Sequence, residues 1–176
     1  MLKRTGTKAT TDEEHTPLDW PNVHALIPAA GQSVRFGGTT LKQYASVRGA
    51  PVMALSIAAV RGHPAVRAVT VVLARDDGIY CDLLAPRYPD VHTTIGGASR
   101  AESVHNGLQS ILETDPETDW VLIHDAARPC LSSRSLDALF NMAFDSSTGE
   151  VRCPGGAILA VPVADTIKRA VEPPVD

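Results

Sequence analysis

The sequence lacks three features that would assign it at once to a broad class of proteins. Its longest candidate apolar segment, Ala54–Val60, is far shorter than the roughly 18 residues that a membrane-spanning helix needs. It has only three cysteines, with no CxxC spacing, which disfavours a disulfide framework and a zinc site. It also has no excess of positive charge, since 16 Lys and Arg stand against 20 Asp and Glu. We therefore expect a cytoplasmic protein with reduced thiols, no membrane insertion and no basic face for nucleic acid.

The length and composition are those of one packed domain. The chain has 176 residues, of which 44% are hydrophobic and 20% are charged, close to the averages for globular domains. Residues 1–22 mix basic and acidic side chains and lack the apolar centre of a secretory signal. We expect residues 1–22 to form a disordered tail and residues 23–176 to form the domain.

Apolar runs alternate with helical patterns from Val23 onward. The runs are mostly continuous, as in strands that are covered on both faces. Five strands are predicted, at Val23–Pro28, Val66–Ala74, Val91–Ile95, Trp120–His124 and Ala157–Val163. Three helices are predicted, at Pro51–Arg61, Ser99–Leu112 and Ser132–Phe144, the last two with serine N-caps. This alternation predicts an α/β fold with a three-layer, mostly parallel sheet.

The loop after the first predicted strand is built of small residues and then carries two cations. Ala29, Ala30 and Gly31 follow the strand directly, and Arg35 and Lys42 come after them. Small residues let backbone N–H groups approach an anion, and the two cations supply full positive charge. The pattern is neither GxxxxGK[ST] nor GxGxxG, which disfavours a P-loop ATPase and a dinucleotide-binding fold. Two interpretations remain open for this loop alone, a triphosphate cradle and an ordinary turn with solvated cations.

Four motifs in the same order along the chain resemble those of the 2-C-methyl-D-erythritol 4-phosphate cytidylyltransferase family. They are PAAG at 28–31 with Arg35 and KQ at 42–43, GGASRAESV at 96–104, HDAARP at 124–129, and PVADTIK at 162–168. The resemblance covers about Ala25 to Ala170. It implies a Rossmann-like nucleotidyltransferase fold. It also implies that the chain ends before the last part of the family's domain, as a truncated product or a shortened relative.

The resemblance also implies a role for particular residues. Arg35 and Lys42 match the catalytic, charge-stabilising pair, and Asp125 is expected to bind substrate and to be a candidate ligand for Mg²⁺. The expected nucleotide-binding residues are Ala29, Ala30, Gly31, Gly97, Arg100 and Ser103. The other expected substrate-binding residues are Ala126, Arg128 and Thr166.

The activity that the resemblance implies is transfer of CMP from CTP to methylerythritol phosphate. Pyrophosphate is the second product, and the reaction belongs to the non-mevalonate route to isoprenoid precursors. The implied cofactor is Mg²⁺ or another divalent cation, and the implied assembly is a homodimer. Two alternatives stay open. The chain could be a ribitol-5-phosphate cytidylyltransferase, or a catalytically impaired remnant that only binds nucleotide or a partner chain.

Overall fold

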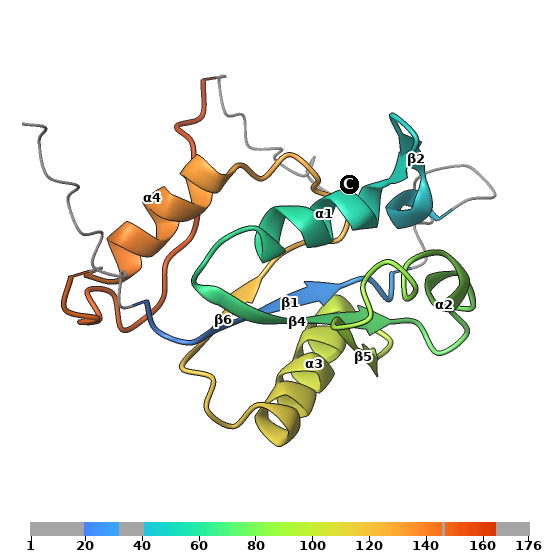
Figure 1. The fold of residues 1–176 in the computed structure, drawn as a ribbon, viewed down its shortest axis with the longest axis horizontal. Coiled ribbons are helices and arrows are strands. Elements are labelled where there is room, and N and C mark those ends of the chain that lie inside the picture. The colour runs from blue at the N-terminus through green and yellow to red at the C-terminus, as the bar shows by residue number, and fades with distance from the viewer. Residues whose placement is uncertain (1–19, 32–40, 146, 165–176) are drawn as a thin grey trace, which may run out of the picture.

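A four-stranded parallel sheet forms the centre of the computed structural model, which describes residues 20–31, 41–145 and 147–164. Its strands are β1 (Val23–Pro28), β4 (Val66–Leu73), β5 (His92–Ile95) and β6 (Trp120–Ile123). They lie in the order β5-β4-β1-β6, and every neighbouring pair is parallel (Figure 1). The predicted α/β fold with a mostly parallel sheet is confirmed.

Helices cover both faces of this sheet, which gives the predicted three layers (Figure 1). Helix α1 (Val52–Arg61) and helix α4 (Ser133–Ala143) lie on one face, and helix α3 (Arg100–Thr114) lies on the other. Side chains of β1 alternate between the two layers: Ala25 and Ile27 pack on the α1 side, and Leu26 packs on the α3 side. Both faces of the central strand are therefore buried.

Short elements connect the layers. A single 3-10 turn, η2 (Lys42–Tyr44), precedes a small hairpin of β2 (Ser46–Val47) and β3 (Ala50–Pro51). Helix α2 (Ile79–Leu83) lies between β4 and β5. Both η2 and α2 lie near the carboxyl ends of the strands, and η2 borders the site described below.

The helix starts follow the sequence signals. The Ser99 hydroxyl caps α3 by accepting a hydrogen bond from the Glu102 N–H. The Glu102 carboxylate in turn accepts a hydrogen bond from the Ser99 N–H, which completes a capping box. Ser132 caps α4 in the same way by accepting the Ser135 N–H. Both predicted caps are confirmed. The sequence predicted Pro51 as the first residue of the helix Pro51–Arg61. In the structure Pro51 is the N-cap of α1, and the helix begins one residue later, at Val52.

Two expectations differ from the structure. The predicted strand Ala157–Val163 is wrong, because described residues 157–164 form neither strand nor helix and the side chains of Ile158 and Val161 are 87% and 85% exposed. Hydrophobicity suggested the strand, but a strand also needs a partner for its backbone groups, and none pairs with this segment among the described residues. The second difference concerns Trp20, which the sequence analysis placed in the tail. Trp20 is buried against His63 and Phe140, whereas residues 1–19 lie outside the described part.

No helix within the described ranges is long and apolar enough to cross a membrane.

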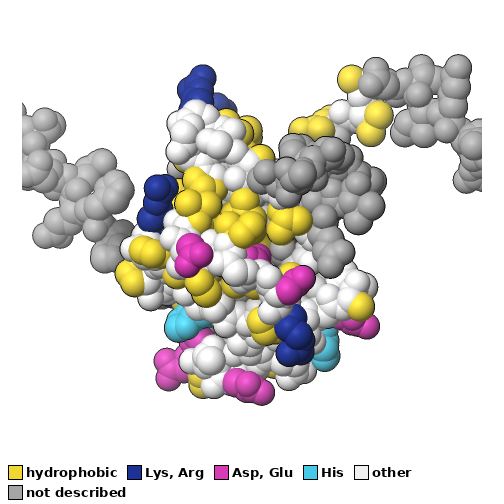
Figure 2. Space-filling view, turned by 90° about the vertical axis from the view of Figure 1, so that its right-hand side faces the viewer, with side chains coloured by type: hydrophobic (Ala, Val, Ile, Leu, Met, Phe, Trp, Pro, Cys, Tyr) yellow, Lys and Arg dark blue, Asp and Glu magenta, His cyan; other side chains and the backbone are white. Residues whose placement is uncertain are grey.

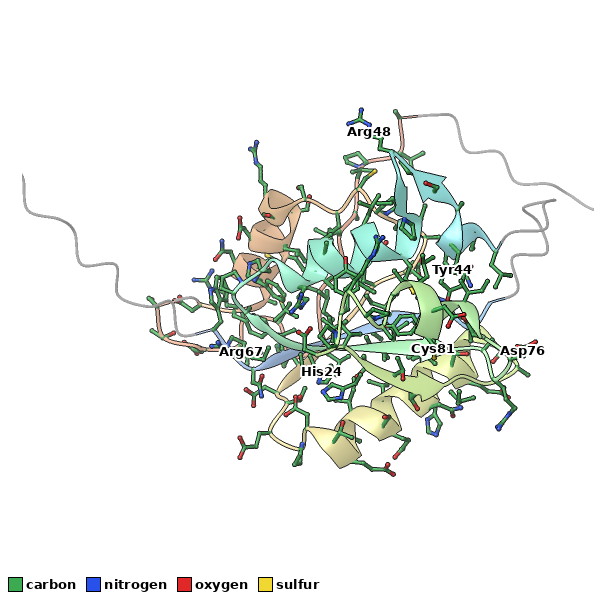
Figure 3. All side chains as sticks on the ribbon, turned by 45° about the vertical axis from the view of Figure 1, so that its right-hand side comes forward. His24, Tyr44, Arg48, Arg67, Asp76 and Cys81 are labelled. Atoms are coloured by element: carbon green, nitrogen blue, oxygen red, sulfur yellow. The ribbon has the colours of Figure 1, made fainter. Side chains whose placement is uncertain are left out.

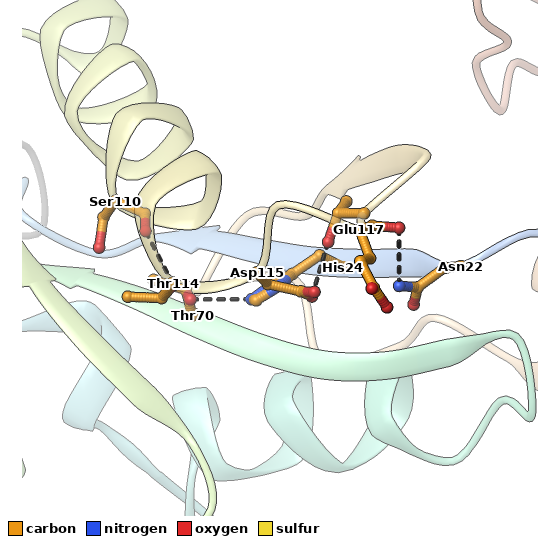
Figure 4. A network of polar contacts seen from close by, with 8 residues as sticks. Asn22, His24, Thr70, Ser110, Thr114, Asp115 and Glu117 are labelled. Carbon is orange, nitrogen blue, oxygen red and sulfur yellow. Dashed lines mark hydrogen bonds and ion pairs between the residues drawn. The ribbon is translucent and has the colours of Figure 1, made fainter.

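A buried polar network ties β1 to the end of α3 (Figure 4). His24 is fully buried, its Nδ1 lies 3.0 Å from Asp115 Oδ2, and its Nε2 lies 2.9 Å from Thr70 Oγ1. Burial lowers the pKa of His24 more than the nearby Asp115 carboxylate raises it. A neutral ring then donates from Nδ1 to Asp115 and accepts the Thr70 hydroxyl at Nε2. His24 lies away from Tyr44 and the carboxyl-end loops (Figure 3), so this network is structural.

The buried state of His24 predicts a loss of stability in acid. The unfolded chain takes up a proton on this histidine near pH 6.5, whereas the folded chain resists it, so the free energy of unfolding should fall as the pH drops from about 7.5 to about 5.5. His24→Gln should make that decline shallower by up to about 1.4 kcal/mol per pH unit. Urea unfolding at several pH values measures it, with His105→Gln on the exposed face of α3 as the control. Equal slopes in wild type and His24→Gln would contradict this account.

Candidate functional site

A cavity of about 820 Å³ opens at the carboxyl ends of the strands. The order of the strands places it there. From β1 the chain winds to β4 and β5 on one side and then returns to β6 on the other, so a crevice forms where the winding direction changes. Three loops line the cavity, those after β1, β5 and β6. In parallel α/β sheets this crevice is where ligands bind.

The first loop supplies small residues and one lysine. Ala29, Ala30 and Gly31 line the cavity, as does Lys42 at the start of η2. Gln43 is buried and donates its side-chain amide to the Ala29 carbonyl at 2.9 Å and to the Gly31 carbonyl at 3.3 Å. The segment with Lys42 is therefore fixed against the end of β1. Arg35 lies outside the described residues, so its predicted role stays a prediction.

The second loop, between β5 and α3, is held closely against the first loop and against its own helix. The Ser103 hydroxyl is buried, accepts the Gly97 N–H at 3.2 Å and lies 2.9 Å from the Ser99 carbonyl oxygen. The Glu102 carboxylate also accepts the Ala98 N–H. Serine and glutamate therefore fix the backbone of the loop where the sequence predicted nucleotide binding at Gly97 and Ser103.

Two positions of this second loop require glycine, because neighbouring atoms come very close to the backbone there. A Cβ atom on Gly96 would lie 2.6 Å from Ala30 Cβ and 2.7 Å from Ser103 Oγ. A Cβ atom on Gly97 would lie 2.4 Å from Glu102 Cβ. Real Cβ atoms essentially never come this close to other atoms. The first and second loops can therefore meet only because Gly96 carries no side chain, whereas Gly97 lets the second loop pack against its own helix.

The third loop, after β6, carries a carboxylate between two guanidinium groups. Asp125 Oδ1 lies 2.9 Å from Arg100 Nη2, and Asp125 Oδ2 lies 2.9 Å from Arg128 Nε. Burial would raise the pKa of the Asp125 carboxyl, but the hydrogen bond from Arg100 and the charges of both arginines hold that pKa below its usual range. Asp125 is therefore a carboxylate at neutral pH. Arg100, expected beside the second loop, joins that loop to the third.

Two side chains, those of Ser56 and His124, fix the shape of the third loop by hydrogen bonds to its backbone. The buried Ser56 hydroxyl of α1 donates to the Ala126 carbonyl at 3.0 Å. His124 Nε2 lies 3.0 Å from the Arg128 carbonyl oxygen and donates to it, which closes the loop on itself. Burial lowers the pKa of His124, so the ring is neutral and acts as a structural donor. These contacts make His124 a structural residue of the third loop.

The cavity has a local excess of positive charge in a chain whose net charge is −4. Among the described residues, the charged ones that line it are Lys42, Arg100, Arg128 and Asp125, three cations and one anion. On the face of the molecule drawn in Figure 2, basic side chains are separated from one another and acidic ones lie among them. The charges that line the cavity suit a small anionic ligand.

The ion pairs in the cavity are weak enough to exchange partners. The side chains of Arg100 and Arg128 are 64% and 78% exposed, and exposed pairs of this kind contribute only about 0–1 kcal/mol each. Replacing the Asp125 carboxylate by a phosphate oxygen as the partner of either guanidinium group therefore costs little. The arrangement holds two arginines ready for an anionic ligand.

The described residues do not fit a cation held by the protein. Asp125 is the only carboxylate among the residues that line the cavity, and both of its oxygens are paired with arginine. Nowhere in the described ranges do three His, Cys, Asp or Glu side chains gather in a way that could hold a metal ion. The geometry thus gives no support to Asp125 as a metal ligand.

Most of the predicted site residues lie at this one cavity. The described ones that line it are Ala29, Ala30, Gly31, Lys42, Gly97, Arg100, Ser103, Asp125, Ala126 and Arg128. Thr166, like Arg35, lies outside the described part of the chain. Sequence analysis assigned no role to Gln43, Ser56 or Glu102, which fix the three loops. A polar residue in an apolar helix was the only signal for Ser56, and the capping-box spacing was the signal for Glu102.

Comparison with known sequences places this arrangement in a family. The model of the 2-C-methyl-D-erythritol 4-phosphate cytidylyltransferase (IspD) family matches residues 23–175. A protein of that name from Dechloromonas aromatica is 46% identical over 158 residues, which is 85% of this chain and 64% of the relative. One from Xanthomonas campestris pv. campestris is 44% identical over 149 residues, covering 85% of this chain and 54% of the relative. The chain therefore spans about half to two thirds of the length of the curated relatives it matches.

Solved structures give the same result. A crystal structure of a 4-diphosphocytidyl-2C-methyl-D-erythritol synthase superposes with a TM-score of 0.69 at 36% identity, covering 86% of this chain and 65% of that one. The synthase from Anaerococcus prevotii superposes with a TM-score of 0.58 at 25% identity, covering 70% and 51%. The predicted Rossmann-like nucleotidyltransferase fold is confirmed by these neighbours.

The contact between the first two loops can be tested at Gly96. Gly96→Ala forces its new methyl group onto Ala30 and Ser103, so we expect it to lower the free energy of unfolding by about 1–3 kcal/mol. Gly78→Ala is the matched control, because a Cβ there meets nothing within 4 Å and the backbone is already right-handed helical. Urea unfolding compares the two variants. Equal stabilities would mean that the loops do not depend on this close approach.

Proposed function

The chain belongs to the 2-C-methyl-D-erythritol 4-phosphate cytidylyltransferase family, and we propose that it transfers CMP from CTP to 2-C-methyl-D-erythritol 4-phosphate. An oxygen of the alcohol phosphate attacks the α-phosphorus of CTP. The bond from that phosphorus to the bridging oxygen breaks, and pyrophosphate leaves with the electron pair. The observation that carries the proposal is the cavity at the change of winding direction, lined by small residues and by Lys42, Arg100 and Arg128.

Charge is the main obstacle to this reaction, because two anions have to meet. Cations that are already in place lower the barrier without any covalent enzyme intermediate. The place of Lys42 in the cavity supports this role for the lysine. Arg35 is proposed as its partner because it matches the family motif. Each such group contributes of order 2.7–4 kcal/mol to stabilising the transition state.

We assign the nucleotide to the first and second loops. Ala29, Ala30 and Gly31 leave room for the phosphates, and the backbone around Gly97 leaves room for the cytosine ring. The Ser103 hydroxyl bonds within the loop, which supports a role in holding the base-binding backbone in shape. Arg100 faces the cavity from the first turn of α3 and can pair with a phosphate.

We assign the alcohol phosphate to the third loop. Asp125 offers a carboxylate that can accept bonds from substrate hydroxyls, and Arg128 offers an exposed guanidinium group for a phosphate. Ala126 leaves space between them, and its carbonyl is tied to Ser56. Thr166 is proposed as a further phosphate contact from the family motif alone.

The proposal includes the cell compartment, the cation and the assembly. The free thiols of Cys81, Cys130 and Cys153 support a cytoplasmic location. A divalent cation enters the proposal only as an ion that the nucleotide phosphates carry, and no step here depends on it. A homodimer is supported by the exposed apolar residues that follow Gly156, and by the outer edge of β6, which pairs with no described strand.

The deciding experiment is a pyrophosphate-release assay with CTP and Mg²⁺. Methylerythritol phosphate and ribitol 5-phosphate are offered separately, and CTP binding is followed by calorimetry. Release with methylerythritol phosphate supports the proposal. Release with ribitol 5-phosphate alone would assign the other substrate, and binding without release would identify a remnant that has kept only its nucleotide site.

Replacement of the two cations gives a sharper prediction. Lys42→Ala and Arg35→Ala should each lower kcat by about 10²–10³-fold, because each removes a group that acts mainly on the charge of the transition state. The Kd for CTP should change far less. Arg48→Ala is the control, since Arg48 lies in the exposed hairpin turn outside the residues that line the cavity. Unchanged kcat in both variants would remove their assigned role.

A further inference from the structure

We propose that Tyr44, held by Asp77, is a positioning residue that fixes Lys42 in the cavity. The inference rests on the proposed function, since it concerns the same lysine. It adds two residues that do not line the cavity but determine where one of its cations lies.

The segment that carries Lys42 is short and needs outside support. η2 is a single 3-10 turn of three residues, closed by the bond from the Tyr44 N–H to the Leu41 carbonyl. No side chain caps its start. Such a turn has little stability of its own, because nucleating a helix fixes several dihedral angles for one hydrogen bond. The position of the turn that carries Lys42 therefore depends in part on what Gln43 and Tyr44 contact.

Those neighbours bind in two different directions. On one side, Gln43 donates to the Ala29 and Gly31 carbonyls and ties the turn to the loop after β1. On the other side, the Tyr44 hydroxyl donates to Asp77 Oδ2 at 2.6 Å and ties the turn to the loop after β4. Lys42 itself is exposed, whereas Gln43 and Tyr44 are buried. The two anchors together form a clamp on the turn that carries Lys42.

Asp77 is a fixed point for this clamp. Its other carboxylate oxygen, Oδ1, accepts the N–H groups of Ile79 and Tyr80 at 3.1 Å each, in the first turn of α2. The carboxylate is thus held by the backbone of one element while it accepts the hydroxyl of another. In Figure 3, Tyr44 lies beside α2 and at the end of the sheet away from His24.

The tyrosine is suited to a permanent contact. Its ring packs in the core cluster that also contains Ala29, Met53 and Tyr80. Burial, followed by the bond to Asp77, raises the pKa of the Tyr44 hydroxyl well above its ordinary value, so this group stays a donor at all neutral pH values. Tyr44→Phe removes this donor and keeps the ring in the core.

The effect should appear in turnover and not in nucleotide affinity. A small displacement of a catalytic group is costly, and a shift of 1 Å can cost about 10²-fold in rate. Loss of one of two anchors should displace Lys42 by less, and we expect Tyr44→Phe to lower kcat roughly tenfold, with KM for CTP changed less than about twofold.

A matched control separates positioning from general destabilisation. Tyr88→Phe also deletes one half-buried tyrosine hydroxyl bond, from Tyr88 to the Ala54 carbonyl at 3.0 Å, in a side chain that packs against the same core cluster. It does not touch η2, and it should leave kcat within about twofold of wild type. The decisive comparison is Tyr44→Phe in the Lys42→Ala background. A residue that acts through Lys42 should cause no further loss of kcat there.

Hydrogen exchange supplies a readout that needs no catalysis. In Tyr44→Phe the amides of residues 41–45 should exchange at least several-fold faster than in wild type, and in Tyr88→Phe they should not. Additive losses of kcat in the double variant, or unchanged exchange over residues 41–45, would overturn the proposal. If the wild-type chain releases no pyrophosphate, the proposed function fails by itself. The exchange result then decides the clamp, with faster exchange supporting it and unchanged exchange overturning it.

Discussion

The arrangement of the whole site depends on one constraint, the close approach of three loops at the carboxyl end of the central strand. Parallel strands on both sides of β1 bring these loops to one edge of the sheet. The first and second loops can touch because Gly96 has no side chain and Ala30 has only a methyl group. Gly107 has a similar effect between α3 and the sheet, since a Cβ there would lie 2.5 Å from Leu26 Cδ1 of β1. Small residues therefore determine where the backbone can close a cavity.

Once the loops meet, buried polar side chains hold them in place. Gln43 binds the first loop, Ser103 binds the second and Ser56 binds the third, each through backbone groups. Charged side chains lie above this frame, with Asp125 between Arg100 and Arg128. The frame is buried and the charges are exposed. A ligand can therefore rearrange the charged pairs without disturbing the backbone that positions them.

Local sequence patterns predicted much of this structure. Continuous apolar runs identified four of the strands, and serine caps fixed the starts of α3 and α4 within one residue. Motif residues far apart in the chain lie at one cavity, since each motif follows a strand and parallel strands end at one edge. The pattern failed at Ala157–Val163, where hydrophobicity was present but no strand pairs with the segment among the described residues. Apolar composition is a property of the segment, whereas pairing is a property of two segments.

By itself, the sequence determined the fold class, the starts of the helices and the identity of most residues at the cavity. The fold class and the helix starts depend on short-range order along the chain, namely periodicity and caps, whereas most of the cavity residues were named from their resemblance to the family's motifs. Only the tertiary structure decided that Asp125 faces two arginines and that Tyr44 is bound to Asp77. The Tyr44 contact joins residues 33 positions apart, and the Arg100 contact joins residues 25 positions apart. Such partners are set by how the layers pack, because a side chain's bonding groups do not specify which distant group will reach them.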